Sequence, residues 1–307
     1  MWTIVANSLR VLKTALRYAL RSTLPGPRAR RVEARRYLVL GILHLLFDEI
    51  TFRRSGFLWT GSPACYVTRM LFVRGHHQDD DLASVIPWLQ ENTDFSRPFI
   101  VNVGANIGDS ALFLSKTGKH VIAIEPNPAT FRRLERNVRQ NGLQGAITCC
   151  QLAVSDVPGD VDLLMVQNSA NSEIVGEGGK VGLREGQRIM GRTRVKAVPL
   201  DYLLDSLGVE ADKVALVVSD TQGFESHVVR SGKRLWAAHT PLWVEVWPKG
   251  LDCHGGTADF FDICKQSFTT VLRCNPFDGE AQRIETLEHI AQGLAPPPND
   301  FADMLLL

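Results

Sequence analysis

One stretch, about a third of the way along the chain, constrains the fold more than any other. A short β-branched run, Phe99–Val103, leads into a turn whose glycines, Gly104 and Gly108, have the spacing Gly-x-x-x-Gly. An amphipathic segment of helical length follows and stops at Gly118, and a second apolar run ends in Glu125. This order of strand, glycine turn, helix and strand predicts a βαβ unit with an acid at the tip of its second strand.

The glycines and the acid indicate what such a unit binds. Glycine lets the backbone approach a ligand without a Cβ in the way, and a carboxylate at this strand tip is placed to accept from the two hydroxyls of a ribose. A dinucleotide fingerprint needs a glycine where Asn106 stands, and Asp109 puts a negative charge in the first helical turn, where a phosphate is repelled. We therefore expect a nucleoside ligand without a phosphate, S-adenosylmethionine (SAM), in preference to a dinucleotide.

Six motifs in consecutive order resemble one known family. They are Val-Gly-Ala-Asn-Ile-Gly (103–108), Glu-Pro-Asn-Pro (125–128), Asn-Val-Arg-Gln-Asn-Gly-Leu (137–143), Ala-Val-Ser-Asp (153–156), Val-Pro-Leu-Asp (198–201) and Ser-Asp-Thr-Gln-Gly-Phe-Glu (219–225). Over about residues 98–250 the chain resembles the FkbM-type methyltransferases, a branch of the class I SAM-dependent methyltransferases. The resemblance implies methylation of oxygen on acceptors as diverse as macrolide hydroxyls and sugars, so it does not fix the substrate.

The alternation of strands and helices after residue 98 predicts an α/β fold. We expect a doubly wound, mostly parallel, seven-stranded sheet, Rossmann-like as in class I methyltransferases, with the ligand at the carboxyl ends of its strands. Later strands are expected at 146–153, 214–219 and 242–246, with a last pair within 268–286, and helices at 127–141, 200–207 and 224–235. The polar, glycine-rich residues 167–194 are expected to form a long loop.

The sequence suggests three parts. Residues 1–97 form an N-terminal helical and β-hairpin extension, 98–290 the SAM-dependent methyltransferase domain, and 291–307 a C-terminal tail that is exposed from about Pro296. Within the extension we expect a helix from Arg28 to about Asp48, a hairpin over 51–75 and a helix over 82–89 that runs through Pro87.

The first 22 residues combine leucines with Arg10, Lys13, Arg17 and Arg21, which predicts a basic amphipathic helix. Such a helix can lie on an anionic membrane surface, act as a transit peptide or pack on its own domain. No run reaches the ~18 apolar residues that span a bilayer. Six cysteines without a CxxC pair favour free thiols in a reducing compartment. We expect a cytoplasmic protein, with peripheral contact at the inner membrane surface through residues 1–22 as the alternative.

Candidate cofactor contacts come from the glycine turn, from the acid-tipped strand and from the segment after the third strand. They are Asn102, Gly104, Ala105, Asn106, Gly108, Glu125, Pro126, Asn127 and Ala153. Asn102 stands where the family usually has an aspartate, so an acceptor is kept but the charge that attracts the SAM amino group is lost. Val218 stands where the family usually has a lysine, which the chain does without.

Candidate catalytic residues lie after the fourth and fifth strands. A hydroxyl acceptor needs a base, and Asp220, Glu245 and, in the next helix, Glu225 are expected to reach the crevice. Asp220 can also be a helix cap, and Asp220 and Glu245 together can share a proton or hold a divalent cation; we favour a base that works without a metal. His227 is expected to be a surface helix residue rather than a base.

Three functions compete. The first is O-methylation of a hydroxyl on a glycan, a lipid-linked sugar or a secondary metabolite, whose binding site segments 167–194 and 248–260 would build. The second is a SAM-binding scaffold without turnover, and the third a dinucleotide-dependent oxidoreductase. The formal net charge of +1 argues against a globally basic nucleic-acid binder. The expected partner is a small-molecule or glycan acceptor, and the sequence gives no sign of the oligomeric state.

Overall fold

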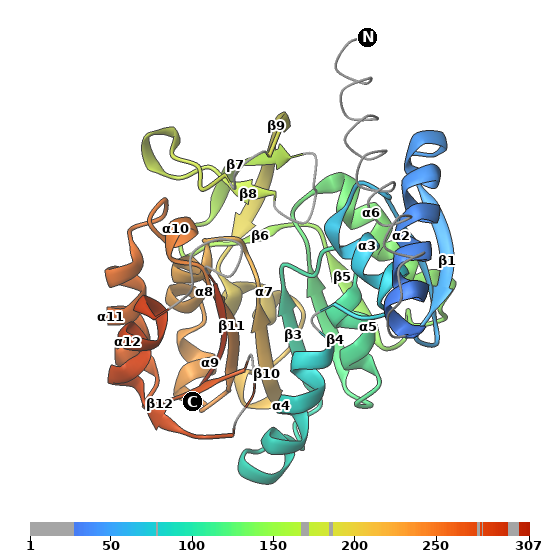
Figure 1. Ribbon diagram of the computed structural model, residues 1–307. Helices are drawn as coiled ribbons and strands as arrows, with labels where there is room; N and C mark the ends of the chain where they lie inside the picture. The colour runs from blue at the N-terminus through green and yellow to red at the C-terminus, as the bar shows by residue number, and fades with distance from the viewer. Residues whose placement is uncertain are drawn as a thin grey trace. The chain divides into compact units, whose positions relative to one another are not determined.

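The computed structural model describes residues 28–77, 79–166, 172–183, 187–274, 277, 279–293 and 301–307 (Figure 1). The chain divides into two compact units. Among the described residues, one unit holds 28–77 and the other holds the rest, from 79 onward. The basic helix expected over residues 1–22 lies outside the described residues. None of the described helices is long and apolar enough to cross a membrane.

The first unit contains two helices and a hairpin. These are α2 (Arg28–Leu46), β1 (Ile50–Arg54), β2 (Phe57–Gly61) and α3 (Tyr66–Val73). The hairpin is antiparallel, and its turn residues Ser55 and Gly56 both have positive φ, as a tight two-residue turn requires. The predicted hairpin is confirmed for residues 50–61.

The strand expected near Tyr66–Val73 was wrong, because these residues form α3. Its buried side chains Val67, Met70, Leu71 and Val73 recur with the spacing of a helix rather than alternating. The run is rich in β-branched and aromatic residues, which favour strands, but the periodicity of its buried side chains determines the structure.

The second unit begins with α4 (Asp79–Asn92), which runs through Pro87 as predicted, and is built around one large sheet. Its strand order is β13-β12-β14-β11-β10-β3-β4-β5. The strands are β3 (Phe99–Val103), β4 (His120–Ile124), β5 (Ile147–Cys150), β10 (Val214–Ser219), β11 (Leu242–Val246), β12 (Thr270–Arg273), β13 (Gln282–Arg283) and β14 (Ala302–Leu306). The run from β11 to β5 is parallel, and β14 is antiparallel to both of its long neighbours. The predicted doubly wound α/β class is confirmed: seven strands carry the sheet, with the two-residue β13 at its edge.

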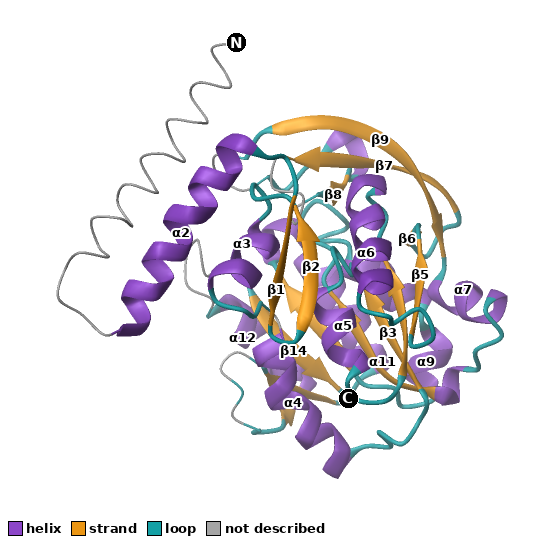
Figure 2. Cartoon of the chain, turned by 90° about the vertical axis from the view of Figure 1, so that its right-hand side faces the viewer, coloured by secondary structure: helices purple, strands orange, loops and turns teal. Residues whose placement is uncertain are grey.

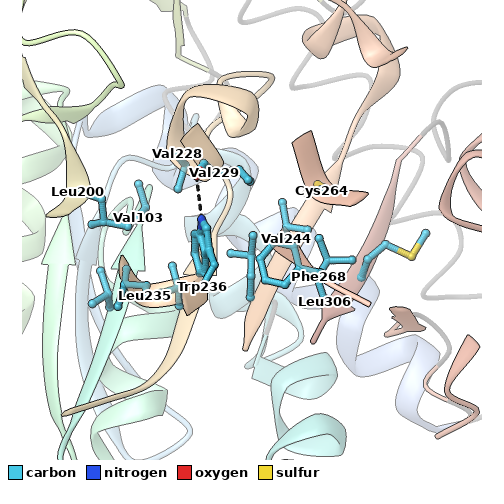
Figure 3. Packing of buried hydrophobic residues seen from close by; sticks show 14 of the residues in the cluster. Val103, Leu200, Val228, Val229, Leu235, Trp236, Val244, Cys264, Phe268 and Leu306 are labelled. Atoms are coloured by element: carbon cyan, nitrogen blue, oxygen red, sulfur yellow. Dashed lines mark hydrogen bonds between the residues drawn. The ribbon is translucent and has the colours of Figure 1, made fainter. Parts of the chain in front are cut away.

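Helices cover both faces of this sheet (Figures 1 and 2). One face carries α4, α5 (Asp109–Ser115) and α6 (Pro128–Gln140), and the other carries α7 (Leu200–Ser206), α8 (Glu225–Ser231), α9 (Lys233–Ala237), α11 (Thr257–Ser267) and α12 (Leu287–Gln292). The helix predicted over 224–235 is two helices, because the chain breaks at Gly232, where a Cβ would lie 2.8 Å from the Trp236 ring. Figure 3 shows that ring in the core, with its Nε1 donating to Val229 O at 2.7 Å.

A smaller sheet was not predicted. Its order is β6-β9-β7-β8, from β6 (Ala153–Val154), β7 (Gly159–Val166), β8 (Glu173–Ile174) and β9 (Ile189–Val198). The prediction of a long loop over 167–194 was therefore wrong for residues 173–174 in β8 and 189–194 in β9. In β9 the buried Val195 and Ala197 alternate with exposed basic side chains, and the charge obscured the strand pattern. The strand expected over 146–153 ends at Cys150, from where the chain passes to the smaller sheet.

The exposed tail expected after Pro296 was wrong as well. All five residues of β14 are buried, and the strand lies between β11 and β12 in the large sheet. The last pair of strands predicted within 268–286 is present as β12 and β13, although β14 separates β12 from the rest of the sheet. The prolines 296–298 suggested an end of the fold, but the apolar run that follows them completes it.

Candidate cofactor and active site

The glycine turn is held between two strand tips. Gly104 N and Ala105 N both donate to Ile124 O at the end of β4, at 2.9 Å each, and Asp220 N donates to Val103 O at 3.0 Å. Gly104 has a φ of +83°, and a Cβ on it would lie 1.9 Å from the Asp220 carbonyl oxygen. Glycine is thus required here by the neighbouring strand tip, a constraint that protein atoms impose whether or not a ligand is bound.

The second glycine serves helix packing. A Cβ on Gly108 would lie 2.9 Å from a methyl of Leu112 in α5 and 2.9 Å from a methyl of Leu134 in α6. Between the two glycines, Asn106 has a φ of +50°, and its Oδ1 accepts from Ile107 N at 2.8 Å, which supports the left-handed conformation. The tight turn brings backbone N–H groups to the tip of the next strand.

The carboxylate of Glu125 accepts hydrogen bonds from backbone N–H groups of two turns. Its Oε2 accepts from Asn106 N at 3.0 Å and its Oε1 from Asn127 N at 2.8 Å, so one carboxylate joins both turns. Burial raises the pKa of Glu125 to about 7, although the two backbone hydrogen bonds favour the charged form. Each carboxylate oxygen keeps a second lone pair, which can accept from a ribose hydroxyl.

Most of the other predicted cofactor residues lie in these same turns. Asn102, in β3, is 2% exposed, and its Oδ1 has no hydrogen-bond partner among the described residues. Asn127 is the N-cap of α6, as expected, and accepts from Ala129 N at 3.0 Å and Thr130 N at 3.4 Å; Ala105 and Pro126 complete the two turns. Ala153 lies apart from them in β6, and its side chain packs in the apolar core of the smaller sheet.

The structure brings Asp220 and Glu245 together through a third residue. Gln222 Nε2 donates to Asp220 Oδ1 at 2.6 Å and to Glu245 Oε1 at 3.1 Å, with Gln222 itself held at a φ of +58°. Because a single amide nitrogen gives its two hydrogens to the two carboxyl groups, both of these oxygens act as acceptors. Asp220 is partly exposed and Glu245 is buried, so Asp220 is the more accessible of the two.

A further carboxyl group at this edge, beside Asp220 and Glu245, was not predicted from the sequence. Asp303 of β14 pairs with Glu245 of β11 in the antiparallel register, and both residues are buried. Side chains of directly paired residues lie on the same face of a sheet. The apolar run after Asp303 was the available signal, because it predicts a strand. Among the described residues, no group of three His, Cys, Asp or Glu is arranged to hold a metal ion.

Glu225 positions the loop that carries Asp220. Its Oε1 accepts from both the backbone N and the Oγ1 of Thr221, at 2.8 Å each, and the side chain is buried at the start of α8. Burial raises the pKa of Glu225 to about 7 as well. Glu225 is 1% exposed and its Oε1 is bonded back to its own loop, while its Oε2 has no hydrogen-bond partner among the described residues. This geometry suits a residue that positions the Asp220 loop, and the catalytic role expected for Glu225 stays a prediction.

These two buried glutamates predict a pH dependence of stability. Between their ordinary pKa of 4.5 and about 7 the folded chain binds more protons than the unfolded chain, so the free energy of unfolding should fall as pH rises and level off above 7. Glu225→Gln should remove the contribution of Glu225 to this fall, at most about 2 kcal/mol between pH 5.5 and 7.5, as measured by urea unfolding at the two pH values. Glu210→Gln, at an exposed site, should leave the dependence unchanged. An unaltered dependence in Glu225→Gln would contradict the assignment.

A histidine pair stands near the smaller sheet. His227, expected on the surface, is only partly exposed: its Nδ1 is bonded to Asp156 Oδ1, and its ring stacks on Phe224 at 3.9 Å. His254 meets the Phe224 ring edge-on at 4.9 Å. Burial and the nearby His227 lower the pKa of His254 to about 4, so it is neutral at pH 7. Asp156 closes the motif of residues 153–156, but nothing in the sequence pairs it with His227.

The two segments expected to build the acceptor site lie against each other. Lys249 Nζ donates to Leu183 O at 2.8 Å, and a Cβ on Gly176 would lie 2.0 Å from Cys253 O. On the same side, a Cβ on Gly182 would lie 3.1 Å from the Trp247 ring. Parts of both expected segments, 172–183 and 248–254, are therefore in contact beyond the tip of β11, next to Trp247.

The parallel part of the sheet has a glycine turn after β3, a buried acid after β4 on one side, and carboxylates at the ends of β10 and β11 on the other. This arrangement defines a Rossmann-like enzyme that uses a nucleoside cofactor. The sequence matches the model of the methyltransferase FkbM domain over residues 102–263, more than half of its length. The chain belongs to this family.

Individual relatives are more distant. The methyltransferase sdnD of Sordaria araneosa is 27% identical over 181 residues, which are 51% of this chain and 69% of that protein. The Pyrococcus abyssi tRNA (uracil-54, C5)-methyltransferase, solved with S-adenosyl-L-homocysteine, is 10% identical with a TM-score of 0.38, over 85% of this chain and 44% of that one. The T. thermophilus 16S rRNA N2 G1207 methyltransferase, solved with AdoMet and guanosine, is 11% identical with a TM-score of 0.38. The match covers 84% of this chain and 49% of that one.

The cofactor of this family is SAM, and the residues present fit it. Glu125 has acceptor capacity for the ribose hydroxyls, as its position at the end of β4 requires. The buried Oδ1 of Asn102 has no protein donor among the described residues, which leaves it available to a donor of the ligand. Asp109, buried in the first turn of α5, suits a cofactor without a phosphate.

Proposed function

We propose that the chain transfers the methyl group of SAM to a hydroxyl oxygen of a small molecule or glycan. When bound, SAM supplies an electrophilic methyl carbon. The observation that carries the proposal is the Asp220–Gln222–Glu245 arrangement, which holds a partly exposed carboxylate beside the glycine turn. An acceptor hydroxyl needs such a base, whereas a carbon or a ring nitrogen acceptor places other demands on the site.

Asp220 is the proposed base. As the acceptor oxygen forms its bond to carbon, its hydroxyl proton becomes acidic, and Asp220 takes that proton late in the reaction. Gln222 supports this role because its amide donates to Asp220 Oδ1 and fixes the carboxylate in one orientation. Glu245 receives the other hydrogen of the same amide, so it orients Gln222 and acts on the reaction through that residue.

The acceptor is proposed to lie between this edge and the contacting segments 172–183 and 248–254. The second segment adds His254, which is neutral, and the Asp156–His227 pair lies next to it, with the His227 and His254 ring centroids 6.0 Å apart. Neutral imidazole and carboxylate groups are hydrogen-bonding partners suited to a polyhydroxylated molecule. The substrate class therefore rests on hydroxyl recognition, with sugars and hydroxylated metabolites as the first molecules to test.

Asp220→Asn should lower the rate of labelled-methyl transfer roughly 10²- to 10⁴-fold, because the amide cannot accept the proton. The affinity for SAM should stay within a few-fold, since Asp220 is not assigned to the cofactor. The assay is transfer from labelled SAM to a pool of glycans and hydroxylated metabolites. Asp212→Asn, at an exposed site, is the matched control and should retain full activity.

Three results would change the proposal. Full activity in Asp220→Asn would remove Asp220 from the mechanism. Loss of activity in EDTA, restored by Mg²⁺, would replace the metal-free base with metal-assisted activation of the hydroxyl. Tight SAM binding without transfer to any acceptor pool would favour the scaffold function, which the substitution of Val218 for the family's usual lysine already suggests as the second candidate.

A further inference from the structure

The charge of the chain is divided unequally between its two parts. Residues 1–77 hold 13 of the 34 Lys and Arg but only three of the 33 Asp and Glu, a formal charge of +10. Residues 78–307 therefore carry 21 basic and 30 acidic side chains, a formal charge of −9. The net charge of +1 conceals this asymmetry. A basic N-terminal part on an acidic remainder indicates a separate anionic partner for the first part.

Helix α2 in this basic part has two different faces. One face packs Leu40, with Tyr37 and Leu43, against Ile50 of β1 and Val73 of α3. The other face is exposed and carries an apolar patch toward its carboxyl end, formed by Val39, Ile42, Leu45 and Leu46 with exposures of 47%, 49%, 40% and 66%; Phe47, 52% exposed, follows the helix directly. A cluster of four large aliphatic side chains in contact with water usually marks an interaction surface.

Arginines accompany this patch. Arg31 and Arg35 are exposed and lie on the same side of α2 as Val39, Ile42 and Leu46. Seen along the helix axis, the side chains at these five positions point within an arc of less than 180°. Residues 28–77 contain nine arginines, against Glu33, Asp48 and Glu49. Asp48 and Glu49 follow the patch at its end, so the arginines dominate the rest of the face.

We propose that the apolar patch of α2, with Arg31 and Arg35, docks this part of the chain on an anionic lipid bilayer. Apolar side chains of such a face enter the boundary between headgroups and acyl chains, and the arginines pair with lipid phosphates and carboxylates. The charge of +10 supplies the attraction to the surface. Nucleic acid, the other polyanion, does not account for exposed Val, Ile and Leu, because base recognition uses aromatic stacking and hydrogen bonds.

The test is co-sedimentation of the full-length chain with phosphatidylcholine vesicles that contain about one third phosphatidylserine, at low salt. Binding is expected there and should be absent with phosphatidylcholine alone. Arg31→Gln with Arg35→Gln should weaken binding roughly thirtyfold, from about 1 kcal/mol for each charge at the surface. Ile42→Ser with Leu46→Ser should weaken it roughly tenfold or more.

The matched control is Met190→Ser with Tyr202→Ser, which changes two side chains of the other unit that are 67% and 63% exposed. It should bind vesicles as the unaltered chain does, and circular dichroism should show all variants folded. Equal binding by the Ile42/Leu46 variant would overturn the proposal, as expected if residues 1–22 cover the patch. Two other results would overturn it. One is that the unaltered chain forms a dimer that dissociates in the Ile42/Leu46 variant, and the other is that the chain binds single-stranded RNA in place of vesicles.

Discussion

Replacing Gly104 with alanine is expected to destabilise the folded chain by about 2–5 kcal/mol, the largest effect of any single methyl group in the site. The left-handed φ of +83° accounts for roughly 1–2 kcal/mol of this. The remainder comes from the Asp220 carbonyl oxygen, which lies 1.9 Å from the position of the new Cβ and forces β3 and β10 apart at their tips. Urea unfolding measures the change, and valine at this position should be worse.

Gly118→Ala separates the two contributions. Gly118 has nearly the same φ, +78°, but nothing lies within 4 Å of a Cβ built on it. It should therefore show the conformational penalty alone, about 1–2 kcal/mol. If Gly104→Ala were no more destabilising than Gly118→Ala, the close approach of Asp220 would be refuted.

Glu125→Ala should weaken SAM binding roughly ten- to a hundredfold, the second large effect. The substitution leaves Asn106 N and Asn127 N without their acceptor and removes the partner of the ribose hydroxyls, and each buried polar group left unpaired costs ~1–3 kcal/mol. Calorimetric titration measures the loss. Glu135→Ala, on the exposed side of α6, is the control and should bind SAM as the unaltered chain does.

The local sequence pattern was sufficient to predict element bounds where strands and helices alternate along the chain. The strands Phe99–Val103, Val214–Ser219 and Leu242–Val246 were predicted to the residue, because each is a short apolar run with a glycine, an acid or a proline close beyond its end. The cap at Asn127 was predicted for the same reason, since Asn followed by Pro has a direct physical meaning at a helix start.

The elements that were not predicted depend on pairing between segments far apart in the chain. Strand β9 has basic side chains on its exposed face, and β14 follows three prolines, so each is recognised only once its partner strands are in place. The same holds for the site. Gln222 joins Asp220 to Glu245, and Asp303 lies opposite Glu245, through contacts between segments far apart in the chain.

The glycine turn shows how a correct prediction can rest on an incomplete reason. Its position and its acid were identified from spacing alone, and the glycines were attributed to a ligand. In the structure, the space of both missing side chains is taken by protein atoms, those of Asp220 for Gly104 and of Leu112 and Leu134 for Gly108. The turn is therefore shaped by its own fold before any cofactor binds.

The central claim is that the tips of β3 and β4 hold SAM through Glu125. Isothermal titration of the full-length chain with SAM, S-adenosylhomocysteine and NAD tests it most directly. We expect a single site for SAM and S-adenosylhomocysteine, with no heat of binding for NAD. The affinity for both ligands should fall at least roughly tenfold in folded Glu125→Ala. Binding of NAD without SAM, or SAM binding that is unchanged in folded Glu125→Ala, would contradict it.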